Sequence, residues 1–147
     1  MHVFRSMILD AKIDLVWQLV RPFDGVVTWN PGVTQARMEQ GTPTEPGSVR
    51  HLDIVDGSVF RETLLALSDT EWSYTYDILD GPLPVTNYVS THRFIPITAT
   101  DQTLGIWESW FDCDSDQRAK MDEVVGDQIY LNGMAGLNQK LKDIRNG

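Results

Sequence analysis

The sequence predicts an α+β protein in which a curved antiparallel sheet of about seven strands wraps around a long C-terminal helix. Three features of the chain point to this class. Short alternating segments, separated by turn residues, recur between residues 33 and 111. Two short helical segments follow the first strand, and residues 115–145 carry apolar side chains at helical spacing. With 147 residues, of which 41% are hydrophobic, we expect a single domain over 1–147.

The N-terminal part of the chain is expected to form one strand and two short helices. Residues 1–9 alternate loosely between apolar and polar types, which favours a strand. Asp10 is expected to cap a helix that runs to Val20, because its carboxylate can accept a hydrogen bond from a free N–H group of the first turn. A second helix is expected over 23–29, and the breaker Asn30-Pro31-Gly32 closes it.

Six further strands are expected after these helices. A hairpin over 47–67 folds back across Asp56-Gly57 and provides two of them. In the last strand, Trp107 and Trp110 fall on opposite faces, so only one of them can face inward. The other four strands are the alternating segments at 33–40, 71–79, 87–95 and 103–111.

The hairpin carries two charged residues, Arg50 and Glu62, inside apolar strands, where a charge is unfavourable unless it meets a partner, water or a ligand. Two registers are compatible with the turn. A two-residue loop, Asp56-Gly57, would place Glu62 opposite His51. A three-residue loop over 56–58 is favoured, because it gives one mostly apolar face. That face combines Arg50, Leu52 and Ile54 with Phe60, Glu62 and Leu64.

The C-terminal segment, from about Ser115 to Arg145, is expected to be one long helix. Its glycines are unusual, because a glycine inside a helix costs about 0.5 to 1 kcal/mol relative to alanine. Gly126, Gly133 and Gly136 therefore indicate either a close approach of neighbouring groups or free volume that would enlarge a cavity under the helix. The apolar stripe consists of Met121, Val125, Ile129, Leu137, Leu141 and Ile144.

Charge and composition exclude several classes of function. The formal net charge of -9, from 21 acidic and 12 basic residues, repels phosphate backbones, so nucleic acid is not an expected partner. No apolar run approaches the roughly 20 residues that a membrane span needs, and the N-terminus lacks the pattern of a signal peptide. The expected location is cytoplasmic. The oligomeric state stays open, and a homodimer is one possibility.

No metal or cofactor site is predicted. The single Cys113 excludes an internal disulfide, and the three histidines are scattered along the sequence. The acidic group Asp112, Asp114 and Asp116 lacks the glycine and the terminal Glu of a calcium loop. It is interpreted as the start of the long helix, where negative charge is favourable.

The ordered set of short motifs resembles the SRPBCC superfamily, in particular the group labelled polyketide cyclase/dehydrase. The resemblance implies the helix-grip fold of START domains and the birch-pollen allergen, with a hydrophobic cavity between the sheet and the long helix. The motifs are Asp14-Leu15-Val16-Trp17, Phe23-Asp24-Gly25, Trp29-Asn30-Pro31, Gly47-Ser48-Val49-Arg50, Asp56-Gly57, Arg61-Glu62-Thr63-Leu64, Tyr76-Asp77-Ile78-Leu79, Pro82-Leu83-Pro84, Asn87-Tyr88-Val89-Ser90-Thr91 and Trp107.

The chain also resembles, more distantly, the plant abscisic-acid receptors. The shared pattern is Glu62-Thr63-Leu64 and Asn87-Tyr88-Val89-Ser90. In those receptors the matching positions line the ligand pocket, which implies a pocket role for Glu62, Tyr88 and Ser90, and for Tyr76 at a matching aromatic position. The chain departs from the receptors at Asp56-Gly57, where a short turn replaces their longer gating loop.

The leading hypothesis is that the protein binds a hydrophobic small molecule, aromatic, polyketide-like or lipid-like, under the long helix. A small-molecule site of this kind is mostly apolar and has a few polar groups that orient the ligand. A second hypothesis is a cyclase or dehydratase in which Glu62 or His92 moves a proton. A third is a structural or interaction protein with a filled core. The expected ligand-binding residues are Arg50, Leu52, Phe60, Glu62, Tyr76, Tyr88, Ser90, Ile129, Gly133 and Leu137.

Simpler interpretations compete with these roles. Arg50 and Glu62 can form a structural ion pair that stabilises the hairpin, and Tyr88 can be plain packing. His92 shares the inward face of its strand with Ser90, but a lone histidine without a nearby nucleophile is more often a core residue. Trp29 is interpreted as a packing plug at the mouth of the cavity rather than a ligand contact.

Overall fold

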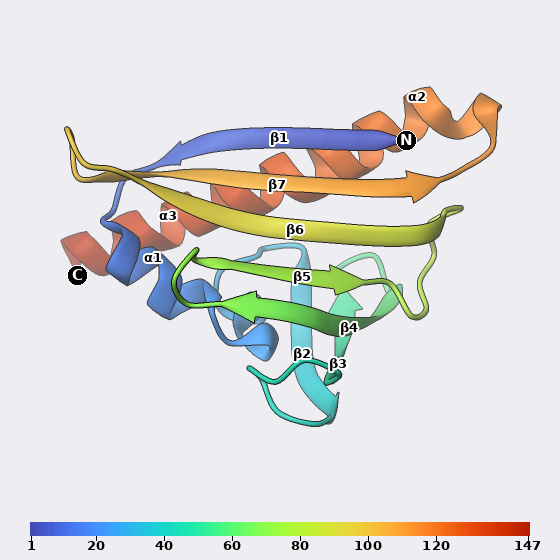
Figure 1. Cartoon of the computed structure of the whole chain (residues 1–147), viewed down its shortest axis with the longest axis horizontal. Coiled ribbons are helices and arrows are strands. Elements are labelled where there is room, and N and C mark those ends of the chain that lie inside the picture. The colour runs from blue at the N-terminus through green and yellow to red at the C-terminus, as the bar shows by residue number, and fades with distance from the viewer.

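The computed structural model describes residues 1–147, which form one seven-stranded antiparallel sheet and a long C-terminal helical segment (Figure 1). The strand order is β1-β7-β6-β5-β4-β3-β2, so that β2 to β7 each pair with their neighbour in sequence and β1 pairs with β7. The predicted fold class is therefore confirmed. The strands are β1 His2–Leu9, β2 Val33–Gln40, β3 Val49–Ile54, β4 Val59–Ser68, β5 Ser73–Asp77, β6 Thr86–Ile97 and β7 Gln102–Asp112.

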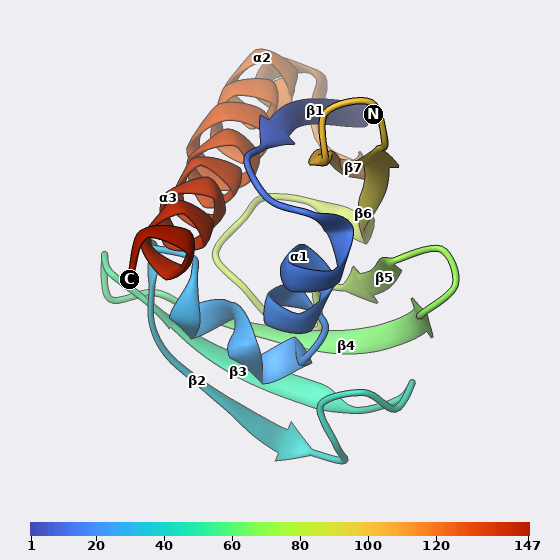
Figure 2. The same ribbon diagram turned by 90° about the vertical axis from the view of Figure 1, so that its left-hand side faces the viewer.

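Two short helices follow β1, as expected: α1 over Ile13–Val20 and the 3₁₀ helix η1 over Phe23–Thr28. Figure 2 shows α1 inside the curve of the sheet, with the long helix along the open side. The prediction that Asp10 caps α1 is wrong. The chain bends at Asp10 and Ala11, Lys12 takes the N-cap position, and the Asp10 carboxylate instead accepts a hydrogen bond from Gln102 Nε2.

The β3–β4 hairpin places Arg50 and Glu62 on one face, as predicted, and directly opposite each other. The loop, however, begins one residue earlier than predicted. The Ile54 N–H donates to the Ser58 carbonyl at 3.0 Å, so the loop is 55–57 rather than 56–58. This shift is favoured because the Asp56 carboxylate accepts hydrogen bonds from both the Ser58 N–H and its hydroxyl, while Gly57 supplies a φ of 90°.

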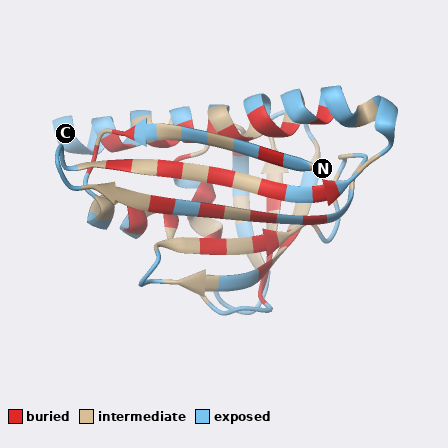
Figure 3. Ribbon diagram, turned by 45° about the horizontal axis from the view of Figure 1, so that its top comes forward, coloured by how far each residue is buried: buried red, intermediate tan, exposed pale blue.

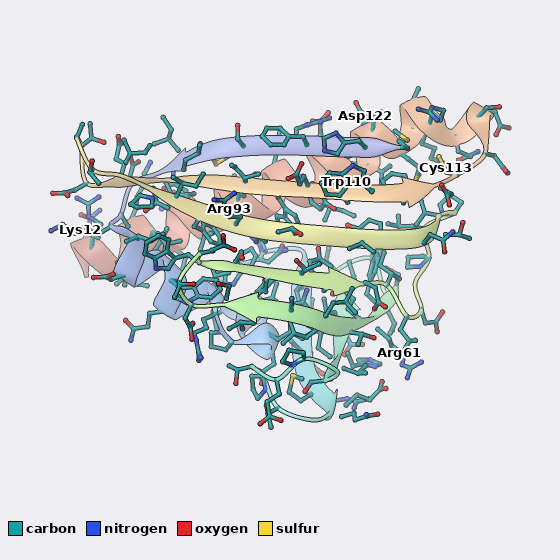
Figure 4. All side chains as sticks on the ribbon, viewed as in Figure 1. Lys12, Arg61, Arg93, Trp110, Cys113 and Asp122 are labelled. Atoms are coloured by element: carbon teal, nitrogen blue, oxygen red, sulfur yellow. The ribbon has the colours of Figure 1, made fainter.

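Buried residues alternate with more exposed ones from Tyr88 to Phe94 in β6 and along β7, which Figure 3 shows as a repeating pattern. Trp107 faces inward and is 3% exposed, whereas Trp110 is 50% exposed. Figure 4 shows Trp110 on the face of the sheet turned away from the long helix. The prediction that only one of these two residues faces inward is confirmed.

The C-terminal segment is not one regular α-helix. It consists of η2 Ser115–Gln117, α2 Arg118–Met121, the π-helix η3 Asp122–Leu131 and α3 Asn132–Asn146. The wider π turn brings Tyr130 into the core, and Ile129 is left only partly buried. The predicted stripe is thus correct at Met121, Val125, Leu137 and Leu141, and Ile129 packs against the core but is only partly buried. It is wrong at Ile144, which is 42% exposed.

The three helical glycines admit neighbouring groups instead of leaving free space. A Cβ atom on Gly133 would lie 2.8 Å from Cζ3 of Trp107, and one on Gly126 would overlap the Arg5 guanidinium. On Gly136 it would lie 2.8 Å from the Trp29 carbonyl oxygen. Of the two alternatives, close approach is confirmed and free volume that enlarges a cavity is wrong, because each of these glycines is a point of close contact.

None of the helices has the length and apolar character that crossing a bilayer requires.

The close contact at Gly136 predicts that Gly136→Ala destabilises the fold. Alanine is intrinsically the better helix former, but its Cβ would collide with the Pro31 ring and the Trp29 carbonyl, neither of which can rotate away. We expect the free energy of unfolding to fall by about 1 to 3 kcal/mol in a urea titration. Asn132→Ala, at an exposed position of the same helix, is the control and should not be destabilising. Equal stability of both variants would contradict the assigned contact.

Candidate functional site

The space between the sheet and the long helix, where the sequence predicts a cavity, is occupied by ring side chains in this structure. Two grooves lie elsewhere on the protein. One of about 880 Å³ lies at the end of α3 against Lys12 and Asp101, and one of about 200 Å³ follows the β5–β6 connection over 78–88. The interior rings, each at most 7% exposed, are Trp29, Tyr74, Tyr76, Tyr88, His92, Phe94, Trp107, Phe111 and Tyr130.

Arg50 and Glu62 form a buried ion pair at one side of this interior. Nε and Nη2 of Arg50 lie 2.9 and 2.8 Å from Oε1 of Glu62, and Nη1 donates to the Phe23 carbonyl at 2.7 Å. The guanidinium also lies 3.8 Å from the centre of the Phe23 ring. Burial raises the pKa of Glu62, and the adjacent Arg50 opposes that rise. Each charge therefore has a partner within the protein.

A cluster of hydroxyl groups lies next to this pair, and we call Tyr76, Tyr88, Ser90 and Tyr130 the hydroxyl cluster. The Ser90 and Tyr130 hydroxyls are 2.9 Å apart, and the Tyr88 and Tyr130 hydroxyls are hydrogen-bonded. The indole N–H of Trp107 lies 3.1 Å from both the Tyr76 and the Ser90 hydroxyl. Burial raises the pKa of Tyr130 to about 12, and it raises those of Tyr76 and Tyr88 well above their ordinary value. These phenols keep their protons at neutral pH and can act as donors.

A second group of polar atoms is buried without partners. Both ring nitrogens of His92 and the Trp29 indole N–H lack a hydrogen-bond partner, and so does the Ser109 hydroxyl. The His92 ring stacks on Trp107 with ring centres 4.2 Å apart. Burial, and to a smaller extent the charge of Arg50, lowers the pKa of His92 to about 3. The imidazole is therefore neutral at physiological pH.

Sheet register explains how these residues come together. In one row across the sheet, Tyr74 pairs with His92 and His92 with Trp107. In an adjacent inward-facing row, Tyr76 pairs with Ser90 and Ser90 with Ser109. Residues that pair across neighbouring strands have their side chains on the same face of the sheet. These two rows across β5, β6 and β7 therefore gather the polar groups on the face that the long helix covers.

The structure brings most of the predicted ligand-binding residues to this interior. Arg50, Leu52, Glu62, Tyr76, Tyr88, Ser90 and Leu137 are buried on the inner side of the protein. Three others are placed differently. Phe60 is partly exposed and lies against Gly81, Ile129 is partly exposed beside Tyr130, and Gly133 is covered by the Trp107 ring. The predicted binding role of these residues stays a prediction.

Tyr130 is the main residue that sequence reasoning did not single out. The helical stripe places Ile129 inward, and only the π turn reverses the two positions. Tyr130 contributes a hydroxyl to the cluster and stacks on Trp107 with ring centres 4.6 Å apart. Trp29, interpreted from the sequence as a packing plug, is buried against Trp107 and His92. Nothing in the sequence indicated that its N–H would be unpaired.

This arrangement suits recognition better than proton transfer. Buried phenol and indole donors in an apolar setting can orient a carbonyl or hydroxyl oxygen. A general base at neutral pH needs a pKa near 7, and His92, with a pKa of about 3, lies far below it. Glu62 is held by Arg50 through two nitrogen contacts. The catalytic roles predicted for Glu62 and His92 remain predictions.

Comparison with known proteins identifies the class. The chain matches the family described as polyketide cyclase / dehydrase and lipid transport over residues 1–142, and it belongs to that family. The resemblance to the SRPBCC group and the helix-grip fold, seen in the sequence motifs, is thereby confirmed.

Individual relatives agree with this assignment. The abscisic acid receptor PYL10 of Arabidopsis thaliana is 34% identical over 86 residues, a match that covers 56% of this chain and 46% of the receptor. The chain thus spans about half the length of that relative. The protein XoxI of Bacillus cereus has a similar structure, with a TM-score of 0.87, 30% identity and coverage of 98% of this chain and 97% of the other. The ginseng major latex-like protein 151 of Panax ginseng shares the fold at 14% identity, with a TM-score of 0.76 and coverage of 97% and 95%.

The buried ion pair predicts an asymmetry between single and double substitutions. Arg50→Met leaves the Glu62 carboxylate buried without its partner and should lower the free energy of unfolding by about 3 to 5 kcal/mol in urea titrations. Combining it with Glu62→Leu should restore most of this loss. Arg61→Met, which removes a more exposed pair with Glu39, is the matched control and should change stability by about 1 kcal/mol or less. A similar loss in both single variants would contradict a structural role for the buried pair.

The neutral buried His92 predicts a pH dependence of stability. Its folded pKa of about 3 lies below the unfolded value of 6.5, so protonation favours the unfolded chain. The stability that this difference contributes is fully present above pH 6.5 and is lost as the pH falls toward 3. Between pH 6 and 5 the wild type should lose about 1 kcal/mol more than His92→Phe. Parallel stability curves for the two proteins would show that His92 is protonated in the fold.

Proposed function

We propose that the protein binds a hydrophobic small molecule that carries an oxygen function, in the space between the sheet and the long helix. The observation that carries the proposal is the concentration of polar atoms in an aromatic interior. An ion pair, four hydroxyl groups and several unpaired nitrogens lie among rings that are almost fully buried. Ligand sites in proteins combine these two features, apolar walls and a few convergent polar groups.

A purely structural core would not need this composition. A buried polar group without a partner costs about 1 to 3 kcal/mol, and apolar residues of similar volume would avoid that cost. Native proteins contain few such groups, and each calls for an explanation such as a bound water, a ligand or a catalytic role. Unpaired nitrogens on Trp29 and His92, both in one interior, favour a ligand site.

The π-helix supports the same assignment. Segments of this kind are rare and are frequently found at functional sites. Here η3 turns Tyr130 toward the hydroxyl cluster, where it bonds to Ser90 and Tyr88. We infer that the helical irregularity is retained because it presents the Tyr130 hydroxyl to the ligand.

Binding requires the interior to open, since rings fill it in this structure. The groove of about 200 Å³ at the β5–β6 connection offers a route. Tyr88 is part of its wall, and the same side chain bonds to Tyr130 inside the protein. We propose that a ligand enters along this groove and displaces the Tyr88–Tyr130 contact, after which the two phenols orient its oxygen. Arg50 and Glu62 lie beside the cluster, with the Arg50 guanidinium 5.1 Å from the centre of the Tyr76 ring, and add polarity to that side of the site.

The aromatic walls favour a ligand with flat rings or a long hydrocarbon body. Ring pairs in offset or edge-to-face contact contribute about 0.5 to 1.5 kcal/mol beyond area burial, so an aromatic or polyketide-like ligand would replace the contacts it disrupts. The family description, polyketide cyclase / dehydrase and lipid transport, is compatible with ligands of both kinds. A receptor named for abscisic acid among the relatives also supports a small-molecule role.

Fluorescence titration tests the proposal. The protein would carry Trp110→Phe, because the exposed Trp110 could respond to ligands adsorbed on the outer face. We expect a saturable change in tryptophan emission with at least one class among fatty acids, sterols, flavonoids and aromatic polyketides, together with a higher melting temperature. Tyr130→Phe should weaken that ligand about tenfold, the effect of one lost hydrogen bond.

Two results would argue against a ligand site. One is the absence of any saturable change or thermal shift across the panel, which would assign the filled interior to structure. The other is an equal affinity of the wild type and Tyr130→Phe for every ligand that binds, which would place the ligand away from the hydroxyl cluster.

A further inference from the structure

The rings of His92 and Trp29, whose nitrogens are all unpaired, are neighbours in the interior. Their ring centres lie 5.9 Å apart, and both rings contact Trp107, with ring centres 4.2 and 6.1 Å from it. His92 is fully buried and Trp29 is 3% exposed, so bulk water does not serve either group. The two side chains come from distant parts of the sequence, β6 and the segment that follows η1. Together they form a compact polar position in the interior, which we call the His92–Trp29 position.

This position is separate from the hydroxyl cluster. Ser90 and Tyr76 belong to one row of the sheet, whereas His92 belongs to the adjacent inward-facing row. The Trp107 N–H, which could have served His92, is directed to Tyr76 and Ser90 instead. The hydroxyl cluster is thus internally bonded, while the His92–Trp29 position lacks partners on all three of its nitrogens.

Packing alone does not explain why histidine and tryptophan, and not phenylalanine, occupy these two places. Phenylalanine at either place would keep an aromatic ring in contact with Trp107 and would bury no unpaired nitrogen. Trp17 provides the contrast within the same protein, because its N–H donates to the Asp69 carboxylate at 2.8 Å. A tryptophan N–H in this fold thus finds a partner where the partner is part of the protein, and Trp29 has none.

The hydrogen-bond donors and acceptors of Trp29 and His92 define which ligand group can pair with both rings. The Trp29 indole is a donor only, and a neutral imidazole has one donor nitrogen and one acceptor nitrogen. Neither nitrogen of His92 is engaged, so its tautomer is free to adapt. A hydroxyl group can pair with a nitrogen of each ring, because its oxygen accepts from Trp29 and its proton goes to the acceptor nitrogen of His92. A carboxylate cannot donate to that acceptor nitrogen and would bury a negative charge without a free cationic partner, since Arg50 is paired with Glu62. An ammonium group could not accept from Trp29.

We propose that His92 and Trp29 form a second polar anchor of the ligand site, which holds a hydroxyl group of an uncharged ligand. The inference rests on the proposed function and makes it more specific. A ligand that reaches both places carries one oxygen at the hydroxyl cluster and a phenol, enol or alcohol hydroxyl at the His92–Trp29 position. The protein would therefore select hydroxylated ligands over otherwise identical compounds that lack the hydroxyl.

Matched ligand pairs test this selectivity. The pairs are monohydroxyflavones and flavone, a sterol and its 3-deoxy form, and 1-naphthol and naphthalene, each titrated into the full-length protein by calorimetry at pH 7.5. We expect the wild type to bind the hydroxylated member of at least one pair about tenfold more tightly. His92→Phe and Trp29→Phe should each abolish this preference while binding the deoxygenated member as the wild type does.

Matched variants separate a ligand role from a structural one. Trp17→Phe loses a protein hydrogen bond and should lower the melting temperature without changing ligand preference. Trp29→Phe should lower the melting temperature of the unliganded protein less than Trp17→Phe, because both lose the same buried indole volume and only Trp17 also loses a bond to protein. His92→Phe, which keeps a ring of similar size, should not lower it. Should His92→Phe fail to fold, His92→Gln, which keeps a donor and an acceptor, should retain part of the preference.

The outcomes distinguish the two proposals. If the wild type binds none of the compounds in the pairs or in the wider panel, the proposed function and the anchor both fall. If it binds but shows no preference for hydroxylated members, or if the preference survives in both phenylalanine variants, the anchor is refuted and the binding function stands. A lower melting temperature of both variants with unchanged ligand preference would assign the position to a buried water and would also refute the anchor.

Discussion

The contact between Trp107 and the long helix is the constraint on which the rest of the interior depends. The indole lies directly under Gly133, at a distance that leaves no room for a side chain. Its ring stacks with His92 from the sheet and with Tyr130 from the helix, and its N–H reaches Tyr76 and Ser90. Because one residue meets both layers, it sets how closely they approach. That spacing closes the interior and brings the phenol of Tyr130 within reach of the sheet.

The interior is therefore dense in packing and polar in composition, a combination that a stable core does not require. Dense packing stabilises the protein through burial of large aromatic surfaces. A buried polar group lowers stability unless it has a hydrogen-bond partner. Only some of the polar groups in this interior have one. The ion pair of Arg50 and Glu62 and the hydroxyl cluster are internally bonded, while His92 and Trp29 are not. We infer that the bonded groups hold the closed form together and that the unbonded groups mark where a ligand oxygen belongs.

The fold was predictable because its signals are local. Alternation along the strands, the turn residues of the hairpin and the helical stripe each act over a few residues, and the ordered motifs point to the same architecture. The errors also have local causes. Asp10 has the character of an N-cap, but the chain turns into α1 two residues later. The hairpin loop moved by one residue because the Asp56 side chain bonds to Ser58, a choice that residue type does not reveal.

The inward face of each strand, and hence Arg50, Glu62, Tyr76, Tyr88 and Ser90 as buried residues, follows from residue order through the period-two geometry of strands. Residue order does not determine whether the space between the sheet and the long helix is open or filled. Helical glycines are equally compatible with an open cavity and with a close contact, and the difference lies in Trp107, Arg5 and Pro31, which meet them from distant parts of the chain. The π turn that exchanges Ile129 for Tyr130, and the lack of partners at His92 and Trp29, likewise arise from packing between distant segments. Such contacts depend on three-dimensional proximity, which residue order encodes only through the completed fold.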